Sequence, residues 1–260
     1  MPIIYNNAKV KNMSYIDDEN ISRLGTQNLP LVKQVSLFFT GWVGFQILGT
    51  ILRVIIVAIF SNVKSAGDVS SLASILINSL TYVYLLIGLV AIINKDILKL
   101  LKSFKQYQSY IAAAFCVLAI FAFNILYNIL IKSLYIPIEN NANEESLQSI
   151  EKVYPFVSVI VFGFIGPICE EITYRVGLFS SLRRKSRIMA YFITIIVFAF
   201  IHFNWSIETP VLLNEVLNLP FYMFAAAAFS FVYDKYGFAA STTAHILNNL
   251  ISILLVSYIH

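Results

Sequence analysis

The chain has 260 residues, of which 58% are hydrophobic and 12% charged, and its formal net charge is +4. An ordinary soluble domain carries about 25% charged residues. Together with a mean hydropathy of +0.76, this composition excludes a soluble globular protein and gives no reason to expect nucleic acid as a partner. The apolar residues fall in blocks long enough to cross about 30 Å of hydrocarbon. We therefore predict an all-α, polytopic membrane protein embedded in the lipid bilayer.

Residues 1–35 are polar and of mixed charge, and they lack the short apolar core of a secretory signal peptide. Seven membrane spans are predicted after this segment, at 36–60, 71–94, 110–132, 156–178, 188–203, 211–233 and 238–259. An eighth is expected only if Pro220, with Asn214, Glu215 and Asn218 before it, divides the sixth span into two pieces. Residues 36–155 thus hold three spans and a long loop at 137–155, which is either a surface loop or a short amphipathic helix.

Basic residues predict the orientation of these spans. Four lie in residues 1–35, four at 95–105 and four at 183–187, and with Lys235 they make up 13 of the 18 Lys and Arg residues. All of them fall on one side of the membrane in the seven-span arrangement. The positive-inside rule then predicts a cytoplasmic N-terminus and an external C-terminus. The loop at 137–155 is predicted to be external.

The fourth span contains charges that a membrane segment normally avoids, in the stretch Pro167–Arg175, "PICEEITYR". A charged side chain near the bilayer centre costs at least about 2.5–3.5 kcal/mol on insertion scales. Glu171 and Arg175 are four residues apart, with the acid first, which favours an ion pair on one helical face. Glu170 projects about 100° around the helix from Glu171, so we expect it to face something else.

Two histidines also lie inside predicted spans. His202 ends the fifth span, four residues after Phe198, and His245 lies in the seventh span, four residues before Asn249. Each pair shares one helical face. Taken singly, such residues are as often packing or interhelical contacts as they are functional groups, so it is their joint occurrence that indicates a site.

These residues resemble the three motifs of the CAAX-protease and bacteriocin-processing family, also called the Abi family. The matching stretches are Glu170-Glu171-x-x-x-Arg175, Phe198-x-x-x-His202 and His245-x-x-x-Asn249, which cover about residues 156–258. The family consists of glutamate-dependent intramembrane endopeptidases and includes the eukaryotic type II CAAX prenyl endopeptidase. The resemblance implies that residues 156–260 form the catalytic helix bundle.

Peptide hydrolysis needs an activated water and a group that stabilises the tetrahedral oxyanion. Glu170 is expected to take a proton from the water, with His202 helping to orient it. The family pattern implies that His245 and Asn249 donate hydrogen bonds to the oxyanion, while Glu171 and Arg175 support the site and Phe198 packs beneath His202. No cofactor is expected, and the partner is a peptide or membrane-protein substrate.

Three alternatives stay open. Glu170, His202 and His245 also match the ligand set of some catalytic zinc sites, although a second general base would then be needed. The same fold could serve as a non-catalytic scaffold for a partner such as a sensor kinase. A transporter would also place acids inside the membrane, but the spans show no convincing inverted repeat.

Bacterial members of the family are associated with peptide maturation and with bacteriocin processing or immunity. The resemblance therefore implies a protein of a bacterial cell membrane with such a role. Prenylated substrates belong to the eukaryotic relatives and are the alternative.

Overall fold

The computed structural model describes residues 29–60, 66–205 and 209–259, and every regular element in these ranges is helical. The first part comprises α2 (Leu31–Phe39), η1 (Thr40–Gly44), α3 (Phe45–Phe60), α4 (Ala66–Ile93), η2 (Asn94–Asp96), α5 (Ile97–Lys102), η3 (Ser103–Lys105), α6 (Tyr107–Ser133) and α7 (Ala142–Val153). The second part comprises α8 (Pro155–Ser158), η4 (Val159–Ile165), α9 (Gly166–Glu170), η5 (Glu171–Phe179), α10 (Ser180–Arg183), α11 (Arg187–Phe200), α12 (Thr209–Tyr236) and α13 (Phe238–Ile259).

The prediction of an all-α, polytopic membrane protein is confirmed. Within the described ranges, six helical stretches are long and apolar enough to cross a membrane: 31–60, 70–105, 107–133, 155–183, 211–236 and 238–255. The fifth predicted span, 188–203, corresponds to α11, whose 14 residues are too few for a full crossing. The first span begins at Leu31, earlier than predicted, and the N-terminal segment before residue 29 lies outside the described residues.

Pro220 does not divide the sixth span, because α12 runs unbroken through it for 28 residues. The polar residues before the proline bind the chain segment that precedes α7. Asn214 accepts a hydrogen bond from the backbone N–H of Glu139 (3.0 Å), and Asn218 donates to the Glu139 carbonyl (2.8 Å). These side chains therefore attach α12 to the loop before α7, and no eighth span forms within the described part of the chain.

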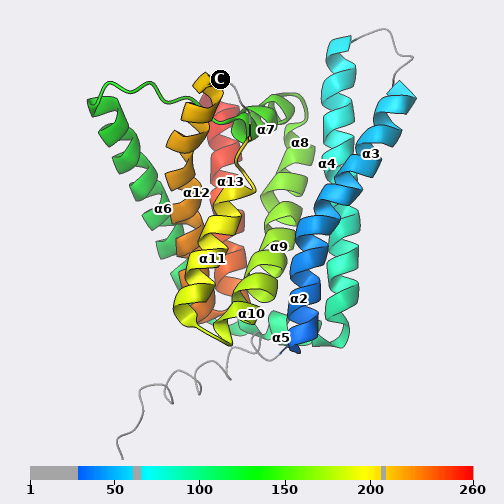
Figure 1. Cartoon of the computed structure of the whole chain (residues 1–260), viewed down its shortest axis with the longest axis vertical. Helices are drawn as coiled ribbons and strands as arrows, with labels where there is room; N and C mark the ends of the chain where they lie inside the picture. The colour runs from blue at the N-terminus through cyan, green and yellow to red at the C-terminus, as the bar shows by residue number, and fades with distance from the viewer. Residues whose placement is uncertain (1–28, 61–65, 206–208, 260) are drawn as a thin grey trace, which may run out of the picture.

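The long loop between the third and fourth spans contains the amphipathic helix α7, so the second of the two alternatives for residues 137–155 is correct. Figure 1 shows α7 at the end of the bundle opposite α5 and α10. Helices α8 to α10 form one long segment through the middle of the molecule (Figure 1). It lies between α2, α3 and α4 on one side and α6, α11, α12 and α13 on the other.

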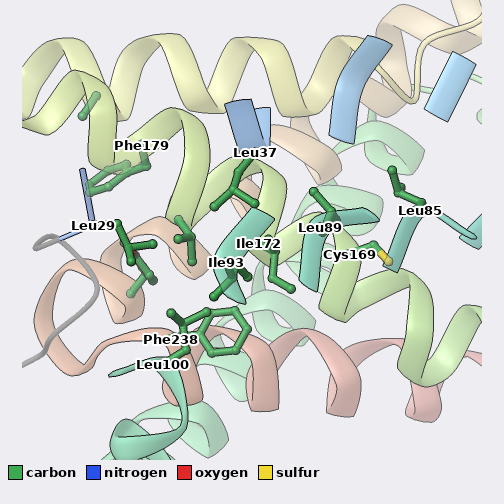
Figure 2. Close-up of a cluster of buried hydrophobic side chains, with 13 residues drawn as sticks. Leu29, Leu37, Leu85, Leu89, Ile93, Leu100, Cys169, Ile172, Phe179 and Phe238 are labelled. Carbon is green, nitrogen blue, oxygen red and sulfur yellow. The ribbon is translucent and has the colours of Figure 1, made fainter. Parts of the chain in front are cut away.

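A buried apolar cluster fixes the lower half of this central segment against its neighbours. Figure 2 shows Ile172 and Phe179 of η5 among Leu37, Leu89 and residues from α5 and α13. The backbones of α2 and η5 approach each other closely at Gly177. A Cβ atom on Gly177 would lie 2.8 Å from the backbone nitrogen of Phe38. This close crossing holds the helix that carries both glutamates.

Candidate active site

The central segment changes helical pitch on both sides of Glu170. Helix α9 is a single stretch of five residues with Pro167 near its start, and it lies between the π-helical segments η4 and η5. Proline lacks the N–H that would continue the regular hydrogen-bond ladder, and π-helical turns within α-helices are frequent at functional sites. The wider turns place the two consecutive glutamates in different surroundings.

Glu170 faces a cavity of about 360 Å³. Its side chain is 19% exposed, and its Oε1 accepts a hydrogen bond from the hydroxyl of Tyr82 on α4 (3.3 Å). Tyr82, Glu170, His202, His245 and Asn249 all line this cavity. The fold therefore gathers the four residues predicted to be catalytic around one space.

Glu171 is completely buried and forms the ion pair that its spacing predicts, with Arg175 Nη1 3.3 Å from Oε1. The guanidinium lies over the ring of Phe198 (4.5 Å to the centroid) and near that of Phe229 (5.5 Å). Such contacts stabilise a buried cation. Phe198 thus supports Arg175 as well as His202, whose ring centroid lies 5.0 Å away.

His245 connects the two glutamates. Its Nδ1 is 3.0 Å from Glu171 Oε1, and its Nε2 is 3.8 Å from Glu170 Oε2. The ring stacks on Phe229 with the centroids 4.5 Å apart. Glu171 is therefore shared between Arg175 and His245, whereas its sequence spacing predicted only the arginine. A carboxylate that accepts from Nδ1–H fixes the tautomer and turns Nε2 toward Glu170.

His202 follows α11 in a short turn and is half-buried in the cavity wall. Its Nδ1 lies 2.9 Å from the Phe198 carbonyl, a contact in which the imidazole donates, and its ring stacks on Tyr222 at 4.5 Å. With Nδ1 so used, Nε2 is the nitrogen left for a water or substrate.

Asn249 is anchored rather than free. Its amide nitrogen donates to the Phe162 carbonyl (3.0 Å), and its oxygen accepts from Asn248 (3.3 Å). An amide has two N–H groups, so one donor remains for a ligand. Asn248, which the motif does not include, lines the same cavity.

Several residues of the cavity carry no sequence motif. Tyr82 lies in an apolar helix rich in aromatics, and nothing in its local pattern distinguishes it. The cavity residue Glu144 is an exception. It follows Asn141 by three residues, and an Asn three residues before a Glu is typical of a helix start. Asn141 caps α7 by accepting from the Glu144 backbone N–H (2.9 Å). It also donates to the His202 carbonyl (3.2 Å).

The zinc alternative needs three ligand atoms around one point. Among the described residues, no group of three or more His, Cys, Asp or Glu side chains is arranged to hold a metal ion. Cys169 is buried, with its thiol 3.7 Å from the Tyr82 carbonyl.

The fold defines a polytopic membrane protein with a cavity among its helices that is lined by polar side chains. The resemblance to the CAAX-protease family is confirmed, because residues 152–251 match the family model described as type II CAAX prenyl endopeptidase Rce1-like. This part of the chain is therefore similar to a family of membrane endopeptidases.

The chain is also similar to an uncharacterized protein of Mycoplasma capricolum subsp. capricolum. The two are 27% identical over 213 residues, which cover 77% of this chain and 60% of the relative. The matched part of the chain thus spans less than two thirds of that relative's length. No solved structure matches it.

Proposed function

We propose that the protein is a glutamate-dependent intramembrane endopeptidase that hydrolyses a peptide or membrane-protein substrate. The observation that carries this proposal is the meeting of Glu170, His202 and His245, from three separate helices, around one cavity inside the bundle. A carboxylate beside two imidazoles supplies the proton acceptor and the donors that amide hydrolysis needs.

In the proposed reaction a water between Glu170 and His202 attacks the carbonyl carbon of the scissile bond. Glu170 accepts the proton of the water and later passes it to the leaving amine, so that the carboxylate is regenerated. The oxyanion receives hydrogen bonds from the remaining N–H of Asn249 and from Nε2 of His245 when that ring is doubly protonated. Glu171, 3.0 Å from Nδ1, neutralises the positive charge of that form.

A bacterial cell membrane is the proposed location, with the N-terminus in the cytoplasm. The similarity to a Mycoplasma protein and the clustering of basic residues at one end of the bundle support this location. Maturation of a secreted peptide, bacteriocin processing or immunity is the proposed role.

The proposal is tested by comparing membrane peptides by mass spectrometry between cells with the wild-type protein and cells with Glu170→Ala. Removing a general base should slow cleavage by roughly 10²–10⁴-fold, so the products disappear and the uncleaved substrate accumulates. Cys169→Ala, which changes the adjacent residue, is the matched control and should leave the products unchanged. Full cleavage by purified Glu170→Ala would refute the mechanism. A knockout phenotype rescued by the Glu170→Ala, His202→Ala double variant would instead favour a scaffold.

The reaction is proposed to need no metal. Purified, active protein should contain much less than one zinc per chain by elemental analysis, and 1,10-phenanthroline should leave cleavage unchanged. Loss of activity with the chelator, restored by zinc, would make Glu170, His202 and His245 metal ligands.

A further inference from the structure

Helix α7 contributes an acidic wall to the cavity. Glu144, Leu147 and Glu151 are spaced three and four residues apart, which puts them on one helical face, and all three line the cavity. Figure 1 shows this helix across one end of the bundle. The wall therefore borders the same cavity as Glu170.

Hydrogen bonds fix the start of α7 to the catalytic part of the fold. The buried carboxylate of Glu215 accepts from the backbone N–H of Ala142 (2.9 Å) and from that of Asn204 (3.0 Å). Tyr222, on which His202 stacks, donates to Asn141 (3.1 Å). Since α7 and the segment carrying His202 share these partners, the acidic wall has a defined position relative to the catalytic residues.

Glu151 is buried in the cavity wall. It is 6% exposed, and none of the described residues forms a hydrogen bond or an ion pair with its carboxyl group. Glu144 differs, since it is half-buried and accepts from Gln148 (3.0 Å). Burying a carboxylate without a partner costs free energy that a bound cation would recover.

The cavity has the charge of a cation-binding site. Its described lining includes three carboxyl groups, on Glu144, Glu151 and Glu170, and no lysine or arginine. Arg175 does not line the cavity and is paired with Glu171. A ligand with a positive group is thus favoured over a neutral or acidic one.

We propose that Glu151, together with Glu144, forms a subsite that binds a lysine or arginine side chain of the peptide substrate. This subsite deepens the proposed endopeptidase function and rests on it. By holding one cationic residue at a set position along the cavity, it would determine which peptide bond lies beside Glu170.

Titration of Glu151 gives the subsite a recognisable signature. Burial and, to a lesser extent, the charge of Glu144 raise the pKa of Glu151 from 4.5 to about 7. Helix α7 packs against α4, α8 and α13, whose titratable groups in the cavity lining are Tyr82 and His245; Glu170 and His202 line it as well. Charges on these groups also act on a cationic peptide, so the pH dependence that belongs to Glu151 is the part that Glu151→Gln removes. The preference for a cation should therefore rise with pH through about 7, as the Glu151 carboxyl ionises.

The test measures binding of three fluorescein-labelled peptides by fluorescence anisotropy. All are twelve-residue leucine–alanine peptides, and their central residue is lysine, norleucine or glutamate. The full-length protein is held in nanodiscs of phosphatidylglycerol, which has no ammonium group, so that a lipid headgroup cannot supply the cation. Nanodiscs containing phosphatidylethanolamine form a second arm, in which competition by the headgroup would weaken binding of the lysine peptide.

Wild-type protein should bind the lysine peptide about tenfold or more tightly than the norleucine peptide and bind the glutamate peptide least. Glu151→Gln should remove this preference while leaving the norleucine peptide within about twofold, which also shows that the variant is folded. Glu144→Gln should reduce the preference in part. Glu145→Gln, exposed on the other side of α7, is the matched control and should behave as wild type.

Equal binding of the three peptides by wild-type protein would overturn the subsite without any variant being needed. So would a lysine preference that survives Glu151→Gln. Mass spectrometry of the same samples reports cleavage separately. If the peptides are cleaved but lysine is not preferred, only the subsite is refuted. If lysine is preferred by wild-type protein and not by Glu151→Gln, but no peptide is cleaved, only the peptidase function is refuted.

Discussion

At the scale of single residues, the adjacent acids Glu170 and Glu171 have different environments. Glu171 is fully buried between Arg175 and His245, whereas Glu170 reaches the cavity and touches Tyr82. The first is neutralised by its partners and holds His245 in position. Glu170 keeps a carboxylate group that is accessible to a water molecule in the cavity.

Replacing Tyr82 by Phe should slow cleavage about tenfold or more, because a hydrogen bond to a charged group contributes roughly 1.5–3 kcal/mol. The ring stays in place, since its contact with Phe45 (5.1 Å between centroids) does not need the hydroxyl. The measurement is the cleavage rate of purified protein, with thermal unfolding as a check of the fold. Tyr84, which is exposed on the same helix, provides the control, and Tyr84→Phe should cleave at the wild-type rate. An unchanged rate in Tyr82→Phe would remove the tyrosine from the site.

At the scale of elements, the central segment from Pro155 to Arg183 is positioned by its close contact with α2. At this contact the two backbones are too near each other for a side chain to fit between them. Gly177 of η5 meets the backbone of α2, where an added Cβ would lie 3.1 Å from the Gln34 carbonyl oxygen as well as against Phe38. Backbone atoms cannot move aside as a flexible side chain can. Helix α2 thus acts as a support for the segment that carries the glutamates.

Gly177→Ala should destabilise the protein by about 1–3 kcal/mol, because overpacking forces the two backbones apart. Unfolding in detergent, followed by intrinsic fluorescence during heating, measures the change. Gly44→Ala is the matched control, since its nearest neighbour would be Thr40 Cγ2 at an ordinary 3.7 Å. Equal transition temperatures for the two variants would contradict the close crossing.

At the scale of the whole molecule, charge is divided between the two ends of the bundle. Basic residues 183–187 and those around α5 lie at one end, and the acidic helix α7 lies at the other. The positive-inside rule assigns the basic end to the cytoplasm. The acidic wall of the cavity would then open toward the outside of the cell.

This orientation predicts how single cysteines react with a membrane-impermeant maleimide in intact cells. Glu145→Cys should be labelled at once, and Lys185→Cys only after the membrane is permeabilised. Both positions are exposed, and the native Cys116 and Cys169 are buried and should contribute little background. The reverse pattern would invert the topology.

The sequence predicted much of the site because intramembrane charges are costly and therefore informative. Glu170, His202, His245 and Asn249 could be selected since each interrupts an apolar span, and the Glu171–Arg175 pair follows from helical spacing. Tyr82 could not be selected, because a tyrosine is ordinary in an apolar helix. Asn214 and Asn218 suggested a broken helix. Their true role could not be predicted, because their partner Glu139 lies more than 70 residues away in the sequence.

The sequence by itself determined the membrane class, the order of the apolar segments, and the residue types available for chemistry. These follow from hydropathy and helical periodicity, which are local properties of the chain. Only the tertiary structure decided that His245 connects the two glutamates, that α11 ends where His202 enters the cavity, and that Glu151 lies buried in the cavity wall. Each of these depends on which helix faces are in contact, and packing between distant segments sets those contacts.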